Sequence, residues 1–97
     1  MRYHQGERFG LSEEVQSYLY WFCRNFYRLT EEERRYIRET AQEVCDGSGM
    51  VPALLSTVTT DRSLICVAGL YYTSPSALQR LCREFYRHLA EKIIEKR

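Results

Sequence analysis

The sequence lacks the features that would place the protein in a membrane or on a secretion route. No apolar run approaches the ~18 residues that a membrane-spanning helix requires. Residues 1–10 contain no apolar segment of the kind found in a secretory signal peptide. We therefore expect a cytoplasmic protein that has no membrane partner.

The sequence also has few residues that bind metals or perform catalysis. It contains two histidines and four cysteines, and no two cysteines form a Cys-x-x-Cys pair. A zinc site needs roughly four clustered ligands, so we expect reduced thiols that pack as small hydrophobic groups, with Cys66 and Cys82 facing inward. There is no glycine-rich phosphate loop and no nucleophile beside an evident base. These absences predict no metal, no other cofactor and no catalytic residue, and therefore a protein that is not an enzyme.

The overall composition is typical of a small globular protein that is rich in tyrosine. Apolar residues make up 44% of the 97 residues and charged residues 28%, and this length suffices for one modest core. Eight tyrosines suit half-buried positions and interfaces, because the side chain joins apolar bulk to a polar tip. The net charge is only +1, but residues 74–97 contain six Lys or Arg against three Glu. This local positive end favours a polyanionic partner.

The first predicted helix has aromatic residues on two sides. Apolar residues recur every three or four positions over residues 11–29, which predicts a helix from an N-cap at Ser12 to about residue 28. Tyr20 and Tyr27 are a heptad apart on the side opposite the apolar stripe, and Trp21 lies at the edge of the stripe. Such a helix needs two neighbours, so we expect a homodimer. The alternative is that the amino-terminal arm or the last helix covers these rings within one protomer.

Local signals mark the next two helices. Thr30 followed three residues later by Glu33 is a capping box, which predicts a second helix that runs to about Cys45 and ends at residues 46–49. Pro52 suits the first turn of a third, shorter helix, because its missing N–H has no helical partner at that position.

The fourth element is open to two interpretations. Thr60 or Asp61 is expected to cap a helix over residues 62–72. Residues 64–67 and 70–73 also have the composition of strands, so a β-hairpin is the alternative. We favour the helix, which gives an all-α fold of four to five helices.

The corner between the fourth and fifth elements has the spacing of two helices that cross at a steep angle. Ala68 is small where the helices approach, Ser74 is the expected N-cap of the last helix, and Pro75 follows at its first position. Leu78 and Leu81 then point back into the corner. This arrangement is typical of a helix-turn-helix.

These patterns predict one domain over residues 1–97. It consists of a loose arm at 1–10, helical support at 11–58, and a segment at 59–97 that ends in a long recognition helix. We expect the helix-turn-helix itself to span about residues 61–95.

The outward face of the last predicted helix has side chains that can bind DNA. Gln can bond to adenine N6/N7 and Arg to guanine O6/N7, and the first two turns of a recognition helix are the ones that reach base edges. The alternative is that these side chains form an ordinary solvated face. We assign base contacts to Gln79, Arg80 and Arg83, a base or phosphate contact to Ser76, and backbone contacts to Arg62, Thr73, Ser74 and Arg87.

The last 40 residues resemble small helix-turn-helix proteins encoded by phages, prophages and mobile elements of Gram-positive bacteria. The resemblance lies in Ser74-Pro75-Ser76-Ala77-Leu78-Gln79-Arg80 and in Arg83-Glu84-Phe85-Tyr86. This family is similar to the fourth region of sigma factors and to phage late-gene regulators. The resemblance implies a transcriptional regulator in which Ser76, Gln79, Arg80 and Arg83 have the recognition role. The chain departs from the pattern at Tyr72, where glycine is usual.

Two hypotheses for function follow from the sequence. The first is a dimeric regulator that binds a short palindrome in double-stranded DNA through the helix opening at Ser74. The second is a protein-interaction module, a phage-type adaptor or inhibitor, that binds a host protein through Tyr20, Trp21 and Tyr27, because Trp and Tyr dominate such sites.

Overall fold

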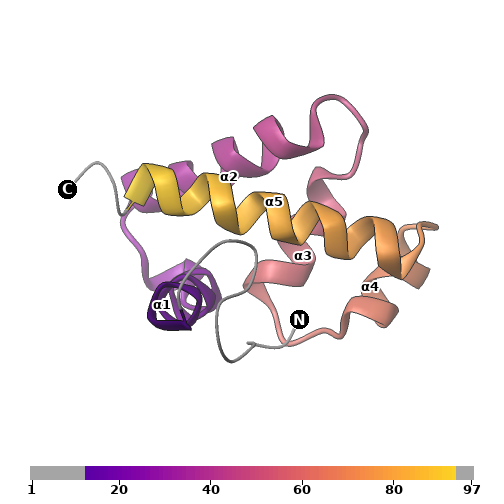
Figure 1. Ribbon diagram of the computed structural model, residues 1–97, viewed down its shortest axis with the longest axis horizontal. Helices are drawn as coiled ribbons and strands as arrows, with labels where there is room; N and C mark the ends of the chain where they lie inside the picture. The colour runs from indigo at the N-terminus through magenta and orange to yellow at the C-terminus, as the bar shows by residue number, and fades with distance from the viewer. Residues whose placement is uncertain (1–12, 94–97) are drawn as a thin grey trace.

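A computed structural model describes residues 13–93, which are entirely helical apart from their connections (Figure 1). No strand occurs in this part of the chain, so the all-α prediction is confirmed and the hairpin is excluded. The predicted arm at 1–10 and the predicted cap Ser12 lie outside the described residues. The helices are α1 (Glu13–Arg24), α2 (Glu31–Cys45), α3 (Val51–Thr59), α4 (Leu64–Leu70) and α5 (Pro75–Ile93), with a short 3-10 helix η1 (Phe26–Arg28).

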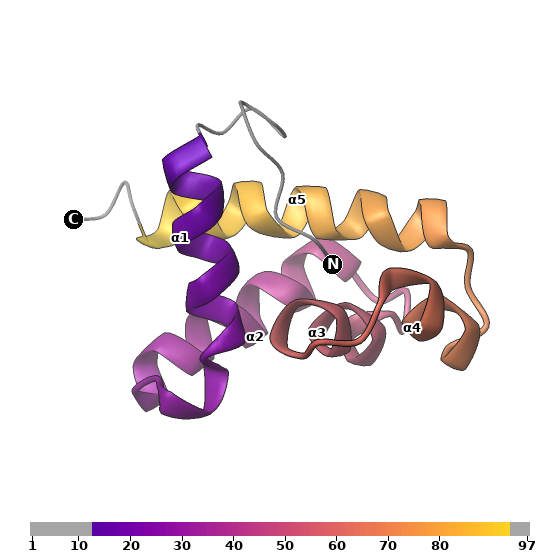
Figure 2. The same cartoon turned by 90° about the horizontal axis from the view of Figure 1, so that it is seen from below.

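The long helix α5 lies at the centre of the packing, and each of the other four α-helices contacts it. α2 runs beside it, and Figure 2 shows α1 crossing its C-terminal half while α3 and α4 lie toward its N-terminal half. The spacing of three and four residues places its apolar side chains on one face, which is buried. The buried residues of α5 are Leu78, Cys82, Phe85, Tyr86, Leu89, Ala90 and Ile93.

The core has two parts. The larger part joins α1, α2, α3 and most of α5 around Phe85, Leu19 and Ile37, all of which are fully buried. The smaller part consists of Ala53, Val67, Ala68 and Leu78, and it fixes α4 against α3 and the beginning of α5. The small side chain of Ala68 lies in the contact, as the sequence predicted.

The start signals of α2 and α3 act as predicted. The Thr30 hydroxyl accepts from the Glu33 amide at 3.2 Å, and the Glu33 carboxylate accepts from the Thr30 amide at 2.9 Å, which completes the capping box. α2 ends at Cys45, and its C-cap Asp46 has a left-handed backbone (φ 42°). Pro52 lies in the first turn of α3.

The prediction that the first helix continues to about residue 28 is wrong. α1 ends at Arg24, and the Asn25 side-chain amide donates to the carbonyl oxygen of Trp21 at 2.8 Å. The Asn25 backbone amide donates to the same carbonyl oxygen at 3.1 Å, and the chain then continues as η1. Tyr27 therefore lies on η1, and the heptad relation to Tyr20 does not hold.

The prediction that Thr60 or Asp61 caps the fourth helix is also wrong. The cap is Ser63, whose hydroxyl accepts from the Cys66 amide at 3.0 Å. The Thr60 hydroxyl instead donates to the Ser56 carbonyl at the end of α3, and Asp61 forms an ion pair with Arg24. These bonds occupy the first two candidate caps, so the helix begins at Leu64, two residues later than predicted.

The four cysteines are free thiols, and their surroundings differ. Cys23, Cys45 and Cys82 are buried, and burial raises the pKa of each thiol, in Cys82 to about 12. These three groups are therefore neutral near pH 7 and pack as small hydrophobic side chains. Cys66 is exposed on α4, which corrects the expectation that it faces inward.

We expect one thiol of the native protein to react rapidly with a disulfide reagent such as DTNB, because only Cys66 is accessible and the buried thiols are both protonated and shielded. The other three should react only on unfolding. The Cys66→Ser variant should lose the rapid phase, and a rapid phase that survives in this variant would contradict the structure.

Candidate nucleic-acid interface

The end of α4 forms a closed hydrogen-bonded turn. The Thr73 amide donates to the Ala68 carbonyl at 2.9 Å, and the Tyr72 amide donates to the Gly69 carbonyl at 3.4 Å. This pair of bonds is the Schellman arrangement, which places Tyr72 in the left-handed conformation (φ 55°) that glycine usually occupies. The turn therefore forms without glycine, but with a tyrosine in a backbone conformation that is unfavourable for it.

The beginning of α5 is fixed by its own cap. The Ser74 hydroxyl accepts from the Ala77 amide at 3.1 Å, the Ser74 carbonyl accepts from the Leu78 amide at 3.1 Å, and Pro75 is the first helical residue. Ser74 is exposed as well as capping, whereas Thr73 is half-buried. The Ser74 cap and Pro75 therefore act as the sequence predicted, and they fix where α5 begins.

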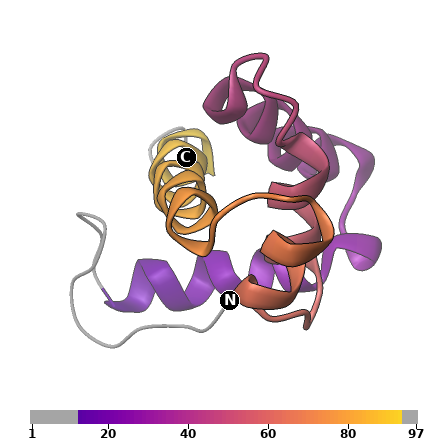
Figure 3. The same cartoon turned by 90° about the vertical axis from the view of Figure 1, so that its right-hand side faces the viewer.

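The outward face of α5 holds the side chains that the sequence assigned to DNA. Positions separated by three, four and seven residues lie on one side of a helix, opposite the buried stripe of Leu78 and Phe85. Figure 3, in which α5 is seen nearly end-on, shows no other helix of the described part of the chain on this side. The exposed residues are Ser76, Gln79, Arg80, Arg83 and Arg87.

Charge is distributed unevenly along this face. Residues 62–83 contain no acidic residue, and none of the ion pairs within residues 13–93 involves Arg80. Farther along, Glu84 pairs with Arg87 at 3.4 Å and lies 3.9 Å from the His88 ring nitrogen. The first half of the outward face is therefore positive, while the second half is mixed.

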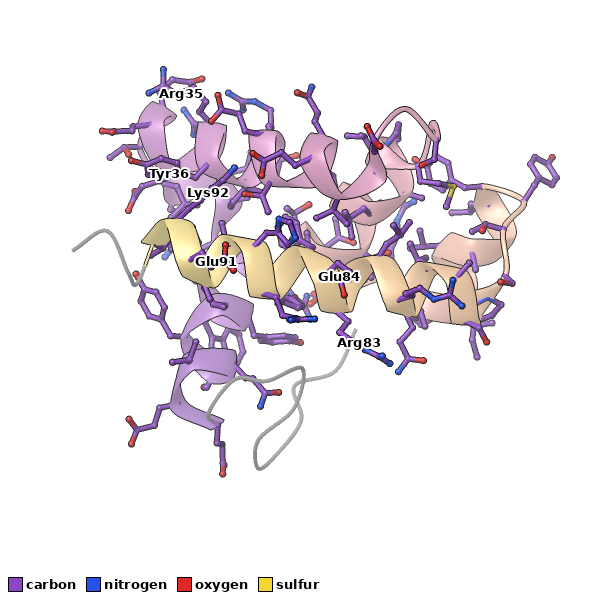
Figure 4. The ribbon with its side chains drawn as sticks, turned by 45° about the horizontal axis from the view of Figure 1, so that its top comes forward. Arg35, Tyr36, Arg83, Glu84, Glu91 and Lys92 are labelled. Carbon is purple, nitrogen blue, oxygen red and sulfur yellow. The ribbon has the colours of Figure 1, made fainter. Side chains whose placement is uncertain are left out.

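Figure 4 shows how the labelled residues follow this division. Arg83 projects from the edge of α5 opposite α2, Glu84 lies beside it near the middle of the helix, and Glu91 lies toward the C-terminal end. Lys92 points toward α2, where it forms an ion pair with Glu43 at 2.8 Å, so its charge is not available on the outward face.

The structure does not bring Arg62 to this face. Arg62 is exposed in the connection before the cap Ser63, so the seven residues of α4 separate it from the corner, a distance of about 10 Å along the helix axis. Its neighbour Asp61 is also exposed and supplies a negative charge beside it. If Arg62 binds a phosphate, that phosphate is therefore a different one from those that the side chains of α5 contact.

The three aromatic residues assigned to a protein interface differ in their surroundings. Tyr20 is half-buried, its hydroxyl accepts a hydrogen bond from Arg24, and the Arg24 guanidinium lies 4.9 Å from its ring centre. Trp21 is 58% exposed and packs edge-on against Tyr20. Tyr27 is 84% exposed on η1. Two of the three rings are accessible, and the third is engaged within the protein.

Sequence reasoning missed a group of exposed apolar residues on and just after α4. They escaped notice because α4 is apolar on all sides, so the pattern does not reveal which face is buried. The large members of this group are Ile65, Leu70, Tyr71 and Tyr72.

Comparison of the chain with protein-family models, with curated protein sequences and with solved structures finds no match. Within residues 13–93, no three His, Cys, Asp or Glu residues gather in a way that would hold a metal ion. No helix in this part of the chain is long and apolar enough to cross a membrane.

We expect Tyr72→Gly to raise the free energy of unfolding by about 0.5–1 kcal/mol, because glycine relieves the left-handed backbone and the lost ring has almost no contacts. Tyr72→Ala removes the same ring but keeps a Cβ atom, so it should give no such gain. Urea denaturation at low micromolar protein concentration measures both variants. Equal stability of the glycine and alanine variants would show that the backbone is not strained.

Proposed function

We propose that this chain is a small sequence-specific DNA-binding protein that presents the first half of α5 to the major groove of double-stranded DNA. The proposal extends to a transcriptional regulator of phage or mobile-element origin, in keeping with the resemblance of residues 74–86 to such proteins. The main support is the exposure of Gln79, Arg80 and Arg83 on one face of α5, within a segment that contains no acidic residue.

The dimensions and chemistry of α5 support this use. Its 19 residues span about 28 Å, and the major groove is wide enough to admit an α-helix. Arg80 takes part in none of the ion pairs among the described residues. Its guanidinium can therefore form a bidentate bond to guanine without breaking one. Gln79 beside it offers the donor and acceptor that adenine requires.

The mixed second half of α5 limits how the helix can lie on DNA. Glu84 would repel phosphate, and it already neutralises part of the charge of Arg87. The first two to three turns should therefore enter the groove, while Arg87 contacts the backbone at its edge.

We expect Arg80→Ala to weaken binding to a duplex selected from a random pool by about 1–3 kcal/mol and to relax base preference at one position, because a bidentate base contact is lost. Arg35→Ala is the matched control, since Arg35 is exposed on α2 and points away from α5 (Figure 4). Fluorescence anisotropy at several salt concentrations measures both variants. The wild-type affinity should fall steeply with salt, and no binding to any duplex at low salt would exclude the proposal.

The second candidate function is a protein-interaction module that binds a host protein through α1 and η1. It is favoured by the exposure of Trp21 and Tyr27, which are residue types that dominate protein interfaces. If it is correct, a partner captured by the immobilised chain should be lost on Trp21→Ala and retained on Arg80→Ala. Loss of the partner on Arg80→Ala alone would assign the binding to α5 instead.

A further inference from the structure

The solvent face of α4 and of the turn that follows it is an uncharged apolar surface. We call it the α4 patch, and it consists of Ile65, Cys66, Gly69, Leu70, Tyr71 and Tyr72. Ile65 is 72% exposed, Leu70 55% and Tyr72 97%. Residues 63–79 contain no charged side chain at all. Single exposed apolar residues are ordinary, whereas a contiguous group of this size is often functional.

Gly69 is a second sign that something packs on this face. It has ordinary helical backbone, and a Cβ atom added to it would meet nothing within 4 Å. Neither the backbone nor the packing of this chain therefore requires glycine here, although glycine weakens a helix relative to alanine. Gly69 and Cys66, one turn earlier, are both small and exposed, so another helix can approach the backbone of α4 closely at these positions.

The backbone of Tyr72 is a third indication that a partner packs on the α4 patch, and it does not depend on the argument from Gly69. The two bonds of the turn hold it in a left-handed conformation that is unfavourable for tyrosine, yet its ring is almost wholly exposed. No contact within the protein compensates for this conformation. A residue kept in an unfavourable backbone conformation at a surface points to use by a partner.

We propose that the partner is a second copy of this chain, and that two α4 patches pack against each other around a two-fold axis. In such a dimer each patch meets itself, and a surface without charge does so without like-charge repulsion. The large side chains of the patch expose about 500 Å² on each copy, so complete burial of both patches gives the roughly 1,000 Å² at which specific interfaces begin, the size of a weak and reversible dimer. A nucleic acid is disfavoured as the occupant, because residues 63–79 offer no cation to its phosphates.

Sedimentation of the full chain between 1 µM and 1 mM, without nucleic acid, tests the proposal. For an interface of this size we expect a reversible dimer with a dissociation constant on the order of 100 µM. Ile65→Asp and Leu70→Asp should each weaken the dimer at least tenfold, and both replace exposed side chains, so the helical content measured by circular dichroism should be unchanged. Trp21→Asp should leave the dimer intact.

Two outcomes of sedimentation would overturn the proposal. One is a chain that stays monomeric over the whole concentration range. The other is a dimer that is lost on Trp21→Asp but kept on Ile65→Asp, which would place the contact on α1. Neither outcome bears on DNA binding, so the proposed function and the proposed dimer can fail separately.

Cross-linking through Cys66 provides a second readout. Cys66 lies on the patch, so in the dimer the two Cys66 thiols should be close, and diamide, which accepts the two electrons and two protons, should join them as a disulfide. The covalent dimer should be absent in Cys66→Ser and at least tenfold less abundant in Ile65→Asp, which keeps the thiol. Equal cross-linking in the wild type and Ile65→Asp would indicate random collision and would overturn the proposal.

Discussion

The structure depends on the packing of one face of α5 against the other four helices. Phe85 and Leu89 are fully buried near the middle of that face, and burial of a side chain of this size contributes several kcal/mol to a fold whose total stability is about 5–15 kcal/mol. Because α5 is fixed along most of its length, its outward residues are held at set positions relative to the corner at Ser74. The same helix therefore forms the core and presents the proposed recognition side chains.

Local signals predicted most of the helix boundaries, and tertiary contacts decided the rest. The capping box at Thr30, Pro52 and the Ser74–Pro75 pair act through hydrogen bonds and backbone geometry within a few residues, so they can be read directly from sequence. The start of α4 cannot be read in this way. Asp61 pairs with Arg24, which is 37 positions away in the chain, and no local pattern reports that contact.

The candidate site was predictable to the extent that α5 is amphipathic. The spacing of its apolar and polar residues correctly separated the buried side from the exposed side. The ion pair between Glu84 and Arg87 could also have been predicted, because residues three apart on a helix are neighbours. The α4 patch was not predictable. A helix that is apolar all round has no face that periodicity can assign to the interior, and this is why Cys66 was placed inward.

Ionic strength affects the ion pair between Arg24 and Asp61, which lies away from the proposed recognition face of α5. The half-buried Arg24 joins the end of α1 to the connection before α4 through the exposed carboxylate of Asp61, and its guanidinium also lies over the ring of Tyr20. Mobile ions screen an exposed carboxylate readily, whereas the contact with the ring persists. Concentrated electrolyte therefore weakens the pair of Arg24 and Asp61 while the guanidinium stays on the aromatic ring, and the hydroxyl bonds of Thr60 and Ser63 still hold the connection at residues 60–63. A salt titration thus acts on this pair as well as on any polyanion bound to α5.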